Sequence, residues 1–159
     1  MSFYVLQGMN RQISIVVLPD DAVSLSSPFD DNYALLLVIA SPLVSVVQRN
    51  RILSDIVSSR CQYALTYGHD CEVWHDAIDW MGVGDGAGTE RFLMTTWHDD
   101  EPIEDVVDFL WSNTSYREFV SGKLAIVLLG RDDKLESMIR DRIAYHQKQE
   151  AEQDAPSNR

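Results

Sequence analysis

Apolar and polar positions along this chain follow a repeating order, in which a short apolar run is followed by a segment with helical spacing of its apolar residues. Continuous apolar runs are typical of strands that are buried on both faces of a parallel sheet, and amphipathic helices connect such strands. The pattern therefore predicts a parallel sheet with helices on both faces. Its strands are expected at residues 34–40, 61–67, 91–97 and 124–129.

The segment after the first of these runs begins with residues that favour a helix start. Ser41 is a typical N-cap, and Pro42 fits the first helical position because its missing N–H would have no partner there. The helix is expected to continue to about Ser59. The residues expected on its buried side are Leu43, Val46, Val47, Leu53, Ile56 and Val57.

Three further helices are predicted in the same way. One follows an N-cap at Asp70, one begins at about Pro102, and the last opens with Asp133 and Glu136, which have the spacing of a capping box. In the helix after Asp70, apolar residues with helical spacing define a buried stripe. That stripe consists of Val73, Trp74, Ala77, Ile78 and Met81.

The two ends of the sequence extend this pattern differently. Residues 3–6 and 13–18 are predicted to be two strands that form a hairpin or an edge of the sheet. The last helix loses its apolar stripe at about Gln147, so residues 147–159 are expected to be frayed or disordered. We therefore predict a single α/β domain over residues 1–146. Its expected architecture is a three-layer αβα sandwich with a Rossmann-like or flavodoxin-like, mostly parallel sheet of about four to six strands.

Composition places the chain among ordinary globular proteins. It has 159 residues, of which 45% are apolar and 24% are charged, and this suffices for one hydrophobic core. The N-terminus lacks a signal-peptide pattern, and no apolar run approaches the ~20 residues of a membrane span. Cys61 and Cys71 are expected to be reduced thiols in a cytoplasmic protein. We expect neither a cofactor nor membrane binding.

The formal charge of −12 argues against direct binding of DNA, RNA or lipid, because a polyanion is repelled by nucleic-acid phosphates and by anionic membranes. Its distribution is uneven: residues 69–108 contain 12 acidic residues against one basic residue, Arg91. The four tryptophans lie at positions 74, 80, 97 and 111, in nearly the same window. The carboxylates that we expect to bind a partner are Glu72, Asp76, Asp79, Asp100, Glu101, Glu104, Asp105 and Asp108.

This acidic window favours a non-enzymatic interaction module that binds a basic protein, as an immunity, inhibitor or accessory protein would. Clustered carboxylates steer a basic partner towards its site, and tryptophan is common among the residues that anchor interfaces. The helices on either side are expected to expose their carboxylates as one continuous negative face. The alternative for the same residues is a solvated surface with the tryptophans in the core.

A second class of function depends on the loops that leave the predicted strands, because ligands of open parallel sheets bind beyond the carboxyl ends of the strands. His69 and Asp70 follow one strand, and His98 and Asp99 follow another. Imidazole and carboxylate together hold divalent ions or activate water, so these four residues define an alternative catalytic and metal site, that of a small metal-dependent hydrolase or nucleotide-processing enzyme. Such a site requires His69 and His98 within metal-bridging distance. Otherwise the chain has no metal site, and these residues are helix caps and exposed histidines.

Two other features favour structural roles. Cys71 lies at a helix start, yet the neighbouring Asp70 and Glu72 disfavour a thiolate. The glycine-rich run at residues 82–88 follows a helix and precedes a strand, which is the reverse of a phosphate-binding loop, so we expect a simple connection. No motif in the sequence is specific enough to name a family.

Overall fold

The computed structural model describes residues 2–5, 11–82 and 93–156, of which residues 2–5 are described as backbone. Six strands form one sheet in the order β1-β2-β6-β3-β4-β5. The strands are β1 (Ser2–Val5), β2 (Gln12–Leu18), β3 (Tyr33–Ile39), β4 (Cys61–Gly68), β5 (Met94–His98) and β6 (Lys123–Leu129). The helices are α1 (Val46–Ser58), α2 (Cys71–Gly82), α3 (Ile103–Ser112) and α4 (Asp133–Asp154).

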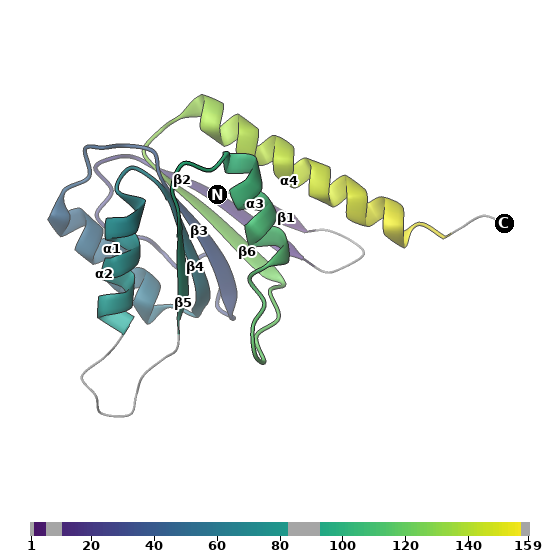
Figure 1. The fold of residues 1–159 in the computed structure, drawn as a ribbon, viewed down its shortest axis with the longest axis horizontal. Coiled ribbons are helices and arrows are strands. Elements are labelled where there is room, and N and C mark those ends of the chain that lie inside the picture. Colours follow the sequence, from purple (N-terminus) through teal and green to yellow (C-terminus); the bar gives the residue numbers. More distant parts are fainter. Residues whose placement is uncertain (1, 6–10, 83–92, 157–159) are drawn as a thin grey trace.

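Helices cover both faces of the sheet, which gives the three layers expected from the sequence (Figure 1). Successive side chains of a strand point to opposite faces, so β3 contributes to both cores. Leu35 and Leu37 pack with α1, α2 and the β2–β3 loop, whereas Leu36 and Val38 pack with α3 and α4. The continuous apolar run of β3 is therefore explained by burial on both sides.

Five strands are parallel, and β1 adds to β2 as an antiparallel edge. A flavodoxin-like sheet has the spatial order 2-1-3-4-5. The parallel strands lie in the order β2-β6-β3-β4-β5. If β6 is counted as the first strand and β2, β3, β4 and β5 as the second to fifth, this order reads 2-1-3-4-5. The predicted fold class is therefore confirmed: the fold is α/β and flavodoxin-like, with the strand order of a circularly permuted chain.

Helix α1 begins later than predicted. Its N-cap is Ser45 instead of Ser41, and Ser45 forms a reciprocal capping box with Gln48. The Gln48 amide also donates to the backbone oxygens of Asp20 and Ala22, which attaches the β2–β3 loop to the helix. A capping box that also holds a neighbouring loop thus fixes the start of the helix.

The later start changes which side chains of this segment are buried. Leu43, Val46 and Val47 are exposed, contrary to the prediction, because the first turn does not share the buried side of the helix. That side consists of Ile52, Leu53 and Ile56.

Helices α2 and α3 begin where predicted but without the expected caps. Asp70 has a left-handed φ of 54°, whereas an N-cap residue is extended. The N-cap of α3 is Pro102, and neither Asp99 nor Asp100 takes that place.

Helix α4 is longer than predicted. Its N-cap is Asp132 instead of Asp133, and the helix continues past Gln147 to Asp154, where we expected a frayed tail. Residues 157–159 lie outside the described residues.

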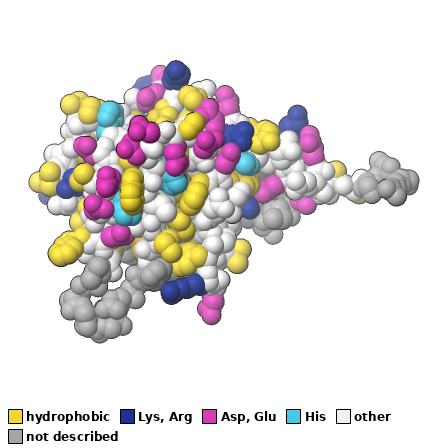
Figure 2. Space-filling view, in the orientation of Figure 1, with side chains coloured by type: hydrophobic (Ala, Val, Ile, Leu, Met, Phe, Trp, Pro, Cys, Tyr) yellow, Lys and Arg dark blue, Asp and Glu magenta, His cyan; other side chains and the backbone are white. Residues whose placement is uncertain are grey.

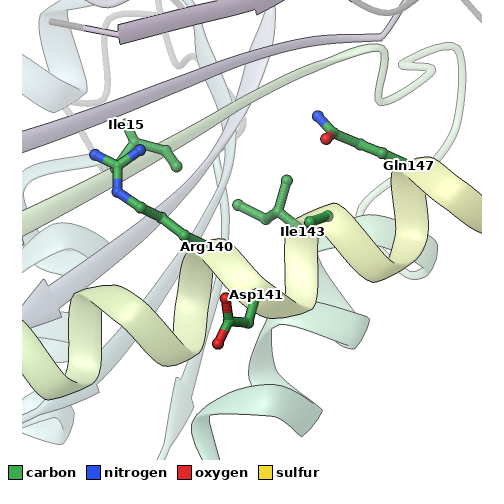
Figure 3. A pocket seen from close by; sticks show the side chains of 6 residues that line it. Ile15, Arg140, Asp141, Ile143 and Gln147 are labelled. Atoms are coloured by element: carbon green, nitrogen blue, oxygen red, sulfur yellow. The ribbon is translucent and has the colours of Figure 1, made fainter.

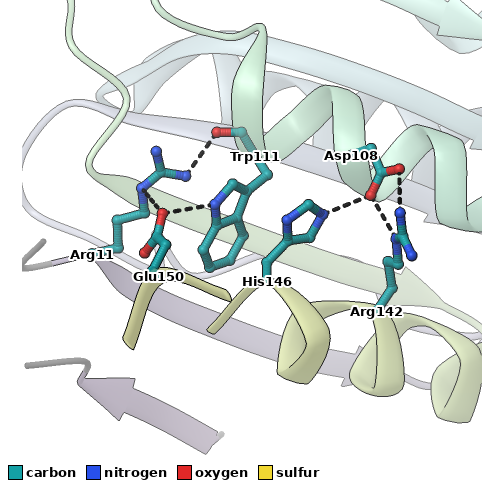
Figure 4. A network of polar contacts seen from close by, with 6 residues as sticks. All are labelled: Arg11, Asp108, Trp111, Arg142, His146 and Glu150. Carbon is teal, nitrogen blue, oxygen red and sulfur yellow. Dashed lines mark hydrogen bonds and ion pairs between the residues drawn. The ribbon is translucent and has the colours of Figure 1, made fainter. Parts of the chain in front are cut away.

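Contacts with α3 and the start of β2 explain why this part of α4 is helical. The indole N–H of Trp111 donates to Glu150 at 2.9 Å, and Arg11 forms an ion pair with the same carboxylate at 3.4 Å (Figure 4). The ring of His146 stacks on Trp111, with ring centroids 4.9 Å apart. After residue 147 the helix has no apolar stripe, and these contacts hold it against the rest of the protein instead.

Some predictions fall partly outside the described residues. The strand expected at residues 91–97 is β5, over Met94–His98, and residues 91–92 are not described. Residue 6 of the N-terminal strand and residues 83–88 of the glycine-rich run also lie outside the described residues. In the described ranges, no helix combines the length and the apolar character needed to cross a membrane.

Candidate functional site

The carboxylates of the acidic window surround one edge of the sheet. Strand β5 forms this edge, with α2 over one face of the sheet and α3 over the other (Figure 1). Figure 2 shows acidic side chains spread over this surface, with few Lys or Arg side chains between them. We call this surface the acidic face. Its exposed and half-exposed carboxylates are Glu72, Asp76, Asp79, Asp99, Asp100, Glu101, Glu104 and Asp105.

A histidine orients two carboxylates of α2. The His75 ring packs against Trp97, with its Nδ1 2.9 Å from Asp76 Oδ1 and its Nε2 3.5 Å from Asp79 Oδ2. Asp79 also accepts a hydrogen bond from the hydroxyl of Thr95 on β5. These contacts attach α2 to the edge strand and hold both carboxylates at the surface.

Five other carboxylates of the acidic face have no cationic side chain within ion-pair distance among the described residues. Residues 69–82 and 93–108, the described part of the acidic window, contain no Lys or Arg. Like charges that are close together repel one another unless solvent or a partner compensates them. The five are Glu72, Asp99, Asp100, Glu104 and Asp105.

The four tryptophans divide into a buried pair and an exposed pair. Trp74 and Trp111 belong to the core, whereas Trp80 is 83% exposed and Trp97 is 46% exposed. Val73, which we expected on the buried stripe, is exposed because it lies with Trp80 on the side of α2 that faces away from the sheet. Two indoles are thus available to a partner on the acidic face.

His98 is turned into the protein. Its Nδ1 lies 2.8 Å from Glu101 Oε2, its Nε2 lies 3.0 Å from Thr96 Oγ1, and its ring packs against Phe109. A hydroxyl next to an imidazole that a carboxylate orients is also the arrangement in which the imidazole activates the hydroxyl as a nucleophile. Here His98 is only 5% exposed and an aromatic ring packs against its imidazole, so we interpret the contacts as holding the β5–α3 loop.

Over the described residues, His98 forms no hydrogen bond or ion pair with the other residues of the enzyme alternative. His69 and Asp99 are exposed, and Asp70 occupies a left-handed turn before α2. Over the described residues, no group of three or more His, Cys, Asp or Glu side chains is arranged to hold a metal ion. Both ring nitrogens of His98 already have partners within the protein. We therefore base no catalytic step on these four residues.

Asp108, which we expected on the acidic face, contacts α4 instead. Arg142 donates two hydrogen bonds of 2.7 Å to its carboxylate, and His146 Nε2 lies 2.6 Å from the same group (Figure 4). The hydrogen bond from Arg142 is the main reason that the pKa of Asp108 lies below its ordinary value. This carboxylate joins α3 to α4.

The cysteines have structural environments. Cys61 and Cys71 are both free and buried, as expected for reduced thiols. Burial raises the pKa of the Cys71 thiol, and the nearby Asp99 raises it further. The Cys71 thiol donates to the backbone oxygen of His98 at 3.7 Å. A raised pKa disfavours the thiolate. The hydrogen bond to His98 joins the start of α2 to the end of β5.

The carboxyl ends of the strands are closely packed where the strand order reverses, between β3 and β6. Gly130 has a φ of 94°, and a Cβ on it would lie 2.6 Å from the Cβ of Ser41. The N–H groups of Ala40 and Ser41 both donate to the oxygen of Leu129, at 2.9 and 3.1 Å. Ligands of this fold class bind in the crevice at such a reversal. In this protein the two loops pack directly on each other there.

Two surface grooves are found among the described residues, and the first lies beside that point, because Tyr67 of β4 and Asp132 of the β6–α4 loop line it. One, of about 290 Å³, is at the starts of α3 and α4, where burial and then the charge of Glu104 raise the pKa of Tyr67. The other, of about 270 Å³, separates α4 from β2; Arg140 and Ile143 point into it towards Ile15 (Figure 3). Only the first groove borders the acidic face.

The comparison with protein families gives one result. The model of a domain of unknown function, DUF7684, matches residues 13–145. The chain belongs to the DUF7684 family. The match includes all five parallel strands and the first part of α4, so the family corresponds to the flavodoxin-like sheet and its helices. For this DUF7684 chain, no curated protein matches and no solved structure matches.

Sequence reasoning located the acidic segment of this DUF7684 protein but missed the contacts made across it. His75 and Thr95 were not predicted to orient carboxylates, because their partners depend on how closely α2 approaches β5. One signal was available for Trp97: alternation along β5 places Thr95 and Trp97 on one side and Thr96 and His98 on the other. With Thr96 and His98 on the α3 side, Trp97 lies on the side of α2.

Proposed function

We propose that this protein is a non-enzymatic interaction module that binds a basic protein partner through the acidic face. The observation that supports this function most directly is the pair of exposed indoles, Trp80 and Trp97, among carboxylates that form no ion pair with Lys or Arg in the described residues. Exposed tryptophan is uncommon on a surface that serves only solubility, and tryptophan is enriched among the residues that dominate binding energy.

Electrostatics supports a basic partner in particular. At physiological ionic strength charges are screened over about 8 Å, so neighbouring carboxylates of the acidic face still repel one another. Lys and Arg side chains of a partner would relieve this repulsion when they bind. The same field would raise the rate of association with a basic protein and disfavour acidic ones.

The geometry of Trp97 supports a pre-organised anchor. Its ring lies 4.6 Å from that of His75, which is itself held near Asp76 and Asp79. A side chain that is already fixed loses little conformational entropy on binding. Trp97 is therefore suited to form the centre of an interface, with carboxylates around it.

Immunity, inhibitor and accessory proteins work by such binding, and we place this protein in that class. Two free, buried cysteines are consistent with a cytoplasmic setting. The enzyme alternative has less support, because the His98 imidazole is covered and the loops at the strand reversal are closely packed.

The test compares two variants with equal changes in charge. In the face variant, the four exchanges Glu72→Gln, Asp99→Asn, Glu104→Gln and Asp105→Asn remove carboxylates that have no ion pair in the described residues. In the control variant, Asp21→Asn, Asp30→Asn, Asp141→Asn and Glu152→Gln remove exposed carboxylates elsewhere. Each variant changes the formal charge from −12 to −8, because four single negative charges are lost.

Partners are isolated in parallel on wild-type protein, the face variant and the control variant, and their affinities are measured by calorimetry at two salt concentrations. We expect the isolated partners to be basic proteins. We expect them to bind the control variant as tightly as they bind wild-type protein. We expect the face variant to lose at least about tenfold in affinity for these partners, because each charged contact contributes on the order of 0.5 kcal/mol. Equal binding of the same partners to the face variant contradicts the proposed function.

A further inference from the structure

Strand β5 is an open edge of the sheet in the described residues. It pairs with β4 in a regular parallel register from Tyr63↔Met94 to Tyr67↔His98, and no described strand lies on its other side. Proteins usually protect such edges with lysine, proline or a bulge, because unpaired backbone groups bind further strands. The sequence of β5, Met-Thr-Thr-Trp-His, contains neither lysine nor proline, and its pairing has no bulge.

Carboxylates flank this strand on both sides of the sheet. On the side of α2, Asp79 accepts a hydrogen bond from Thr95, a residue of β5 itself. On the side of α3, Glu101 is held by His98, the last residue of β5. An extended segment along the edge would place successive side chains alternately over these two flanks. Its positive charges would then meet carboxylates on either side.

Trp97 adds an apolar contact at the same edge. It is half-exposed on the α2 side of β5, next to His75. Indole is the ring that binds Lys and Arg most strongly through cation–π contacts. A basic side chain can therefore contact the Trp97 ring and the carboxylate of Asp79 together.

We infer that the β5 edge binds an extended, basic segment of the partner as an additional strand of the sheet. This inference rests on the proposed function and specifies the conformation of the bound segment. Backbone hydrogen bonds along the edge supply affinity, and Lys or Arg at alternate positions supplies specificity. A basic helix lying over the acidic face is the competing mode, and it needs no backbone contact with β5.

The test uses three synthetic probes of equal length and equal positive charge. The first is an alternating Lys-Thr peptide, which favours an extended conformation. The second is the same peptide with two consecutive central residues N-methylated, so that neither edge of the peptide keeps its full set of donors. The third is a helical peptide of Ala and Lys. Affinities are measured by calorimetry, and hydrogen exchange of the β5 amides is followed by NMR spectroscopy.

We expect the first probe to bind, and the N-methylated probe to bind about fivefold more weakly, since the bound edge loses one donor and a backbone hydrogen bond is worth about 1 kcal/mol. The helical probe should also bind more weakly. The first probe should slow hydrogen exchange along β5. The exchange Trp97→Ala should weaken its binding, while the control variant should bind it as wild type does.

Equal affinity of all three probes for wild type, together with loss of binding to the face variant, would overturn strand addition and leave the proposed function standing. If the face variant also binds all three probes as tightly as wild type does, both strand addition and the proposed function are contradicted. Absence of binding by the first probe also overturns strand addition, whereas the proposed function is then decided separately, by the isolation of natural partners.

Discussion

Gly68 and Gly130 each end a strand in a left-handed turn, and the sheet packs against them where a side chain would be. Their φ values are 99° and 94°. A Cβ on Gly68 would lie 2.4 Å from the backbone oxygen of Ile39, and one on Gly130 would lie 2.6 Å from the Cβ of Ser41. Both positions combine a backbone conformation that disfavours other residues with a contact that cannot relax easily.

We therefore predict that Gly68→Ala and Gly130→Ala each lower the free energy of unfolding by about 2 kcal/mol or more, from overpacking and from the left-handed backbone together. The measurement is denaturation in urea. Gly122→Ala is the matched control, because a Cβ on Gly122 would meet nothing within 4 Å. It should stay within about 0.5 kcal/mol of wild type. A Gly130→Ala variant as stable as this control would contradict the close packing at the strand reversal.

Single side chains were the hardest part of the candidate site to predict. Helical periodicity correctly exposes Glu72, Asp76 and Asp79, because they lie away from the apolar stripe of α2. It fails for Val73, since α2 carries apolar residues on its outer side as well. The hydrogen bond from Thr95 to Asp79 joins residues 16 positions apart, and no local pattern contains that information.

Among the elements, α3 and α4 are joined by apolar packing and by the ion pair of Asp108. Its folded-state pKa lies below the ordinary 3.8, chiefly because of the hydrogen bond from Arg142. A lowered pKa contributes stability that is fully present above pH 3.8 and is lost as the pH falls through the folded-state value. The contact should therefore weaken in acid.

We predict that Asp108→Asn lowers the free energy of unfolding by about 1 kcal/mol at pH 7, because a partly exposed bidentate ion pair is lost. The difference between wild type and variant should shrink as the pH falls below about 4, where the wild-type carboxylate also becomes neutral. Urea denaturation at several pH values measures both effects. Asp141→Asn, which removes an exposed carboxylate of α4, serves as the control. A difference that stays constant down to pH 2 would contradict the role given to the ionised carboxylate.

Elements were predicted well where their signal is local. The apolar runs of β3, β4 and β6 became strands because burial on both faces requires continuous apolar residues. The start of α1 was wrong because Ser41-Pro42 and Ser45 both have the form of a helix start; Gln48, three residues after Ser45, was the deciding signal. The end of α4 could not be predicted, since it depends on a contact between Trp111 and Glu150 across 39 positions.

Over the whole molecule, the formal charge of −12 opposes folding through self-repulsion. Salt reduces the range of this repulsion from about 30 Å at 0.01 M to about 8 Å at 0.15 M. We predict that the midpoint of thermal unfolding rises between these two concentrations. The rise should be smaller in the face variant than in the control variant, although their net charges are equal, because the carboxylates of the acidic face are the more closely grouped. Differential scanning calorimetry measures all three proteins, and equal rises in the two variants would show that only net charge matters.

The start of the parallel part of the sheet lies near the end of α4, since Arg11, the residue before β2, forms an ion pair with Glu150 in the last turns of α4. A short linker between those ends would close the backbone into a ring. Cutting that ring between α3 and β6 gives a chain that starts with β6 and follows the 2-1-3-4-5 order from its first strand. Every strand keeps its neighbours in this rearranged gene product. Residues 69–108 also stay in one uncut stretch, so the acidic face and the point at which synthesis begins are independent features of this architecture.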